Sequence, residues 1–161
     1  MRATRFILAA VAFIAVLSLM SCKAMNTTTG IENNRLAPCP SSPNCVSSDA
    51  TDEGHAVEPF GLATDLDQAW AALQEVMKSR PRTRIVELTG DYLHAEEKSR
   101  LFGFVDDIEF HLRPGQSLIA VRSASRTGYS DLGVNRRRVE AIRQALKDRG
   151  ELEAEVEIVP P

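Results

Sequence analysis

The fold is decided by the stretch Asp106-Asp107-Ile108-Glu109-Phe110-His111-Leu112-Arg113, which is followed by the turn signal Pro114-Gly115. Apolar and polar residues alternate along this stretch, as they do in a strand that buries one face. Residues 117–125 predict the returning strand, and their run Leu118–Val121 is apolar on both faces. The stretch therefore predicts an antiparallel hairpin with one face in the core and a second face that can be covered too.

Two stretches with apolar residues at helical spacing lie on either side of the predicted strands. The first begins at Thr64, which is expected to be the N-cap, and ends at Pro81. The second covers residues 134–149 and is followed by Gly150, a residue typical of helix C-termini. The apolar stripes of both helices predict core residues: Leu66, Ala69, Trp70, Leu73, Val76 and Met77 in the first, and Val139, Ile142 and Leu146 in the second.

The order of the elements indicates the fold class. Residues 82–88 and 92–98 are strand-like and flank Thr89-Gly90-Asp91, a hairpin signal. A short strand near residues 56–60 is expected to precede them. The sequence therefore predicts an α+β fold in the order helix, four strands, helix: a curved antiparallel sheet of about four to five strands with the two main helices packed on one face.

The beginning of the chain has the features of a secretory leader. Arg2 and Arg5 precede an apolar run, residues 6–19. This run is shorter than the span of about 20 residues that a transmembrane helix needs. A charged start and a short apolar core indicate a signal sequence, and an uncleaved N-terminal anchor is the alternative.

The apolar run closes on Leu19-Met20-Ser21-Cys22, which resembles the lipobox of bacterial lipoproteins. The resemblance implies that residues 1–21 are a signal peptide and that Cys22 carries a lipid, so that the membrane is a partner through this lipid. By the same resemblance to bacterial lipoproteins, Lys23 after the cysteine implies the outer membrane rather than the inner one. The expected location is the bacterial cell envelope, with the protein facing the periplasm.

Charge and cysteine content narrow the function classes. The chain has a net charge of -3, which makes it a poor general nucleic-acid binder because phosphate attraction needs a basic surface. Outside the cytoplasm, Cys39 and Cys45 indicate a disulfide. A metal site would usually need four ligands, and a thioredoxin-type role would need a shorter Cys-x-x-Cys spacing, so these remain the weaker alternatives. No metal or cofactor is expected.

The chain divides into a tether, one domain and a tail. Residues 22–35 are polar after the lipidated cysteine and are expected to form a flexible tether. Residues 36–150 are long enough for a single core-bearing domain and too short for two. Within residues 151–161, acidic and apolar residues alternate, which is typical of an edge strand or a solvated tail.

Three blocks stand out from ordinary patterning, at residues 39–48, 102–109 and 122–136. In this order they resemble DUF1499, a domain family of unknown function, over residues 36–146. The family has no settled activity, so the resemblance implies a fold rather than a reaction. The matching motif positions are Cys39, Cys45, Asp106, Asp107, Arg122, Ser123, Ser125, Arg126, Gly128, Asp131, Asn135 and Arg136.

The third block also predicts an anion-binding site. Its arginines and hydroxyls lie at a strand end, and the loop that follows leads into a helix N-terminus, where amide groups are free to bind anions. A small anionic or amphipathic ligand would suit the site, and a protein partner would instead meet the same residues on a flat surface. The candidate ligand-binding residues are Arg122, Ser123, Ser125, Arg126, Tyr129, Asp131, Asn135 and Arg136.

A structural explanation of the same residues remains open. Asp106 and Asp107 could form supporting ion pairs with Arg122 or Arg126 across the sheet. Asp131 and Asn135 could merely cap the last helix, as such residues commonly do. Both explanations predict that the block stabilises the domain rather than holding a ligand.

A serine-type hydrolase is the alternative function, with His94 as the base for Ser123 or Ser125 and Asp106 as the orienting group. The chain lacks a Gly-x-Ser-x-Gly elbow, and the neighbours of His94 predict an exposed histidine. The favoured function is therefore a non-enzymatic, lipid-anchored envelope domain that binds a small ligand or a protein partner.

Overall fold

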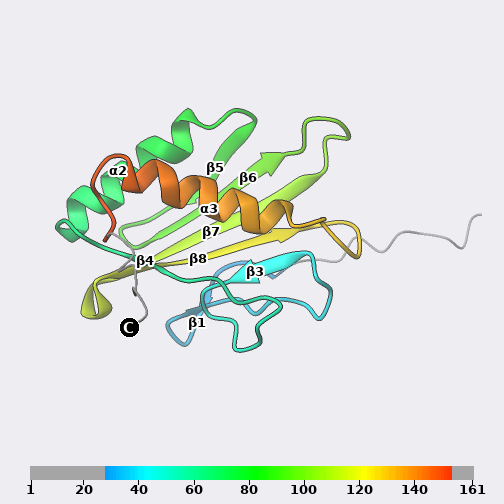
Figure 1. The fold of residues 1–161 in the computed structure, drawn as a ribbon, viewed down its shortest axis with the longest axis horizontal. Helices are drawn as coiled ribbons and strands as arrows, with labels where there is room; N and C mark the ends of the chain where they lie inside the picture. Colours follow the sequence, from blue (N-terminus) through cyan, green and yellow to red (C-terminus); the bar gives the residue numbers. More distant parts are fainter. Residues whose placement is uncertain (1–27, 154–161) are drawn as a thin grey trace, which may run out of the picture.

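The computed structural model describes residues 28–153 (Figure 1). The predicted signal peptide and Cys22 lie outside the described residues. Within the described range, no helix has the length and apolar character needed to cross a membrane.

The domain is built on a six-stranded antiparallel sheet with both helices on one face (Figure 1). The strand order is β3-β8-β7-β6-β5, and β4 pairs with β8 beside β3. The α+β class and the antiparallel sheet are therefore confirmed, with six strands in place of four to five. The strands are β3 (Cys45–Ser47), β4 (Phe60–Gly61), β5 (Thr83–Leu88), β6 (Tyr92–Lys98), β7 (Val105–Arg113) and β8 (Leu118–Ser125).

Helices α2 (Leu66–Ser79) and α3 (Val134–Lys147) cover the core side of the sheet, which we call the helix face. The expected cap of α2 is off by one residue, because the carboxylate of Asp65 accepts the backbone N–H of Gln68 while Thr64 donates to Glu151. Every residue of the predicted apolar stripes is buried or packed against the core. The short helix η1 (Pro114–Gln116) makes the turn between β7 and β8.

The opposite face of the sheet is covered by residues 30–39, which we call the strap. It contains the two-stranded hairpin β1 (Ile31–Glu32) and β2 (Arg35–Leu36). The N–H of Gly30 donates to the Glu109 carboxylate at 2.6 Å, and Leu36 packs against Tyr92 and Ala120. The expectation of a flexible tether up to Arg35 is therefore wrong, because the chain already packs on the sheet at Gly30.

The predicted disulfide between Cys39 and Cys45 is confirmed and joins the strap to β3. The beginning of the predicted C-terminal segment is also placed. Leu152 forms an isolated antiparallel bridge with Leu62, and Ala63 N–H donates to the carbonyl of Glu151. The rest of that segment lies outside the described residues.

Candidate functional site

The register of β7 and β8 divides the predicted site residues between the two faces of the sheet. Ser123 lies opposite Ile108, a core residue on the helix face. Arg122 lies opposite Glu109 and points to the strap face, because successive residues of a strand alternate sides. The arginines and the hydroxyls of the third block therefore do not share one surface.

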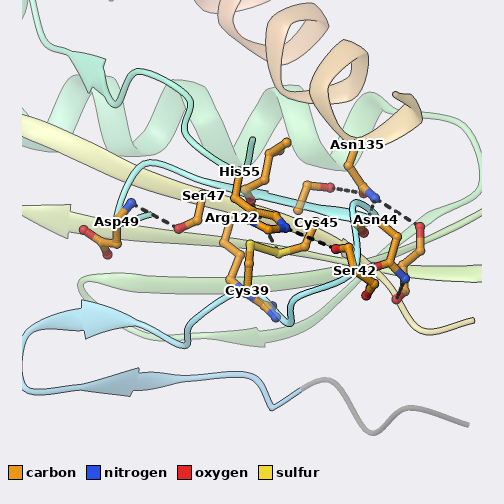
Figure 2. Close-up of a disulfide and its surroundings, with 12 residues drawn as sticks. Cys39, Ser42, Asn44, Cys45, Ser47, Asp49, His55, Arg122 and Asn135 are labelled. Atoms are coloured by element: carbon orange, nitrogen blue, oxygen red, sulfur yellow. Dashed lines mark hydrogen bonds between the residues drawn. A yellow bond between two sulfur atoms is a disulfide. The ribbon is translucent and has the colours of Figure 1, made fainter. Parts of the chain in front are cut away.

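Asn135 of α3 is the centre of a buried network on the helix face. Its side-chain oxygen accepts from Ser123 Oγ at 2.7 Å and from Arg138 Nη1 at 2.6 Å. Its side-chain nitrogen donates to the carbonyl of Asn44 at 2.9 Å and to Ser125 Oγ at 3.0 Å (Figure 2). The amide thus has partners on both its oxygen and its nitrogen, and the network holds α3 against the sheet.

Arg138 completes this network and was not predicted from the sequence. Its Nη2 pairs with the buried carboxylate of Asp106, and its Nε pairs with Glu97 at 3.1 Å. Burial raises the pKa of Glu97, but Arg138 and Arg80 outweigh that effect and hold the pKa below its usual value. The expected pairing of Asp106 with Arg122 or Arg126 is wrong, because Arg138 reaches it from α3.

Glu109 is the centre of a second buried network, on the strap face. Its carboxylate pairs with Arg122 Nη1 and accepts the hydroxyl of Tyr92 at 2.8 Å, in addition to Gly30 N–H. Burial and the neighbouring Glu109 raise the pKa of Tyr92. Figure 2 shows Arg122 on the same side of the sheet as the disulfide. Its Nε and Nη2 are buried and have no hydrogen-bond partner among residues 28–153.

Asp107 pairs with Arg126, and this is one of the ion pairs expected from the sequence. Arg126 donates from Nε at 2.9 Å and from Nη2 at 2.7 Å, and Nη2 also reaches Glu96. The hydrogen bond to Asp107 raises the pKa of Arg126. The Arg84 and Arg126 guanidinium groups hold the pKa of Glu96 below its usual value. Arg126 is therefore occupied by two carboxylates of the sheet.

The geometry does not form the predicted hydrolase site. His94 is buried, with its Nε2 2.7 Å from Asp107 Oδ1, so the expectation of an exposed histidine is wrong. In the register His94 lies opposite Glu109, on the strap face, whereas Ser123 and Ser125 face the helices. Because the sheet separates both serines from the histidine, neither serine hydroxyl can donate a hydrogen bond to His94.

The remaining predicted ligand residues lie apart from one another. Asp131 caps α3 by accepting the N–H groups of Gly133 and Asn135. Arg136 donates to the carbonyls of Ala56 and Gly54. Tyr129 is exposed in the loop between β8 and α3. The eight candidate residues do not assemble into one binding face.

Two open pockets lie elsewhere on the surface. One of about 390 Å³ lies beside the strap and is lined by residues that include Arg35, Cys39 and Asp49. Another of about 590 Å³ lies between α3 and residues 56–61. Arg143 lines this pocket, stacks over the buried Phe60 ring at 4.6 Å and donates to the carbonyls of residues 58 and 59. These guanidinium donors serve the protein's own backbone rather than a ligand.

Large apolar side chains are exposed on two loops at one end of the sheet, and the sequence analysis had named only Tyr129 among them as a candidate binding residue. We call this set of residues the tip. Its members are 53–84% exposed, and the Leu-Phe-Gly-Phe turn after β6 was its signal in the sequence. The tip consists of Leu101, Phe102, Phe104, Tyr129 and Leu132.

Comparison with known proteins identifies a family whose function is not assigned. No curated protein matches the chain. The model of the family described as "Protein of unknown function (DUF1499)" matches residues 35–146. This match covers β2 and β3, the four long strands, almost all of α3 and both buried networks apart from Gly30. The chain therefore belongs to the DUF1499 family.

Proposed function

We propose that the protein is a non-enzymatic, lipid-anchored domain of the bacterial cell envelope that acts by docking to a surface. One observation carries this proposal. The side chains that were expected to form an anion pocket are bound to other residues of the domain, as is the case for Arg122, Ser123 and Arg126. The tip, by contrast, exposes large apolar side chains that have no role in the core. Exposed apolar patches commonly mark interaction sites.

The proposed location rests on the lipobox-like stretch and on the disulfide. Disulfides persist in oxidising compartments such as the periplasm and are rare in the cytosol. Cys39 and Cys45 are joined, and Cys22 follows an apolar run of the length expected for a leader. Both features support an envelope protein held by a lipid on Cys22.

The anchor is tested by labelling the full chain in bacteria with an alkyne analogue of palmitate. The wild-type chain should carry the label and sediment with membranes, and the Cys22→Ser chain should do neither. An unlabelled wild-type chain would contradict the proposed anchor.

The docking mode is tested by native mass spectrometry of the full chain released gently from membranes. The expected spectrum shows the lipidated protein without a further small molecule. The full chain is used because a domain that begins at Leu36 would lose the hydrogen bond between the Gly30 N–H and the Glu109 carboxylate. A retained non-protein mass that disappears in a folded Arg126→Ala variant would overturn the docking mode in favour of a ligand pocket.

A further inference from the structure

The two loops of the tip leave the same end of the sheet. Lys98, the last residue of β6, pairs with Val105, the first of β7. Asp106 pairs with Ser125, the last residue of β8. The loops that follow β6 and β8 therefore leave the same end of the sheet, on either side of the start of β7 (Figure 1). Within the first loop the rings of Phe102 and Phe104 stack at 5.5 Å between centroids.

The charges around the tip favour an anionic surface. Lys98 and Arg100 are exposed, and residues 98–104 contain no acidic residue. The carboxylate of Asp131, in the second loop, is occupied in capping α3. Aromatic side chains beside basic ones are typical of segments that lie in the interface of a lipid bilayer. Anionic lipids add an attraction to each nearby Lys or Arg.

The path of the strap brings its N-terminal end to the same side as the tip. From β2 the chain runs to Cys39, which is bonded to Cys45, and Cys45 pairs with Ala124 near the end of β8. β2 therefore runs toward the tip end of the sheet. Because β1 is antiparallel to β2, the chain enters β1 from the tip end.

The distance available to the anchor is short. From Cys22 to residue 28, where the described structure begins, a fully extended chain spans at most about 20 Å. This reach is about half the thickness of a bilayer with its headgroup layers. A lipid on Cys22 therefore keeps the point at which the described chain begins, on the tip side of the sheet, within about 20 Å of the membrane. The opposite end, at the hairpin of residues 89–91, is the far end of the sheet.

We propose that the tip inserts into the headgroup interface of the membrane that holds the Cys22 lipid, with Lys98 and Arg100 on anionic phosphate groups. This inference rests on the proposed lipid anchor and specifies the surface to which the domain docks. The aromatic and leucine side chains supply the apolar contact, and the two cations orient the end of the sheet toward the bilayer.

The test uses a tryptophan reporter at the tip of the full lipidated chain. Phe102→Trp is compared with Leu88→Trp, an exposed position at the far end of the sheet. The natural Trp70 is buried and gives the same background in both chains. Each chain is reconstituted into vesicles of phosphatidylethanolamine and phosphatidylglycerol containing brominated lipid, and flotation verifies that the chain is membrane-bound.

We expect lipid quenching of the Phe102→Trp reporter to exceed that of the Leu88→Trp reporter at least about twofold, since only the tip enters the interface. Equal quenching of two floating chains overturns the inference but leaves the anchor intact, and the tip is then an interface with a protein. A dimer of the Cys22→Ser chain that is lost in Phe102→Ser would identify that protein as a second copy. If the wild-type chain carries no covalent lipid and does not float with the vesicles, the proposed anchor and the inference are both overturned.

Discussion

Asp106 and Asp107 are adjacent in β7, yet their carboxylates pair with different arginines on opposite faces of the sheet. Asp106 meets Arg138 of α3 on the helix face. Asp107 meets Arg126 at the end of β8 on the strap face. Both carboxylates are buried, and a buried charge is tolerated only when it is paired and hydrogen-bonded. The two pairs fix α3 and the end of β8 to the same point of the sheet.

Arg138→Ala should strongly destabilise the domain. Its removal leaves Asp106 buried without its cation, a change that costs about 3–5 kcal/mol of unfolding free energy. The control is Arg137→Ala, next to it on the exposed side of α3, which should cost less than about 1 kcal/mol. Denaturant unfolding measures both. Similar losses in the two variants would contradict a structural role specific to Arg138.

The buried pair of Arg122 and Glu109 should be replaceable as a unit. Arg122→Met alone leaves the Glu109 carboxylate uncompensated and should cost about 3–5 kcal/mol. Combining it with Glu109→Gln removes the charge that is left, and most of the lost stability should return. A double variant that is less stable than Arg122→Met alone would show that the pair does not act as a unit.

The disulfide should contribute modestly to stability because it closes a short loop. Replacing Cys39 and Cys45 by serine should lower the free energy of unfolding by about 2 kcal/mol. Ser41→Ala, at an exposed position of the same loop, is the control and should change it little. Chemical denaturation of the oxidised and variant chains measures the difference. If replacing the cysteines lowers the free energy of unfolding no more than Ser41→Ala does, the disulfide does not stabilise the attachment of the strap to β3.

Acid should destabilise the domain through its paired carboxylates. The pKa of Glu97 is lower in the folded chain than its ordinary value of 4.5. The unfolded chain therefore takes up the proton first, so the contribution is fully present above pH 4.5 and is lost as pH falls through the lowered pKa. In the Glu97→Gln variant, the free energy of unfolding should fall less steeply below pH 4.5 than in the wild-type chain. The control Glu53→Gln, at an exposed position, should leave the slope unchanged. An unchanged slope in Glu97→Gln would contradict the prediction.

The sequence predicted the long strands to within one residue because alternation and turn residues are local signals. Alternation also separates Arg122 from Ser123, since neighbouring strand residues point to opposite faces, so a single site built from both could have been rejected at once. The partners Glu109 and Arg138 required the register of β7 with β8 and the rotation of α3. These depend on contacts between distant segments.

The burial of His94 could not be predicted for a different reason. Its strand looks half-exposed in the sequence, but His94 pairs with Asp107 of the neighbouring strand. The face on which His94 lies is covered by the strap, a segment with the composition of a tether. The strap is held by contacts of Gly30 and Leu36 and by the disulfide. None of these contacts leaves a periodic signal in the sequence.

The most direct test of the account is hydrogen–deuterium exchange on the lipidated chain bound to vesicles, with the soluble Cys22→Ser chain as reference. The account predicts that membrane binding slows amide exchange in residues 99–104 and 127–133, the two loops of the tip, and leaves the rest of the domain unchanged. Slowed exchange around either pocket, or no change at the tip, would contradict the claim that the domain works through this surface.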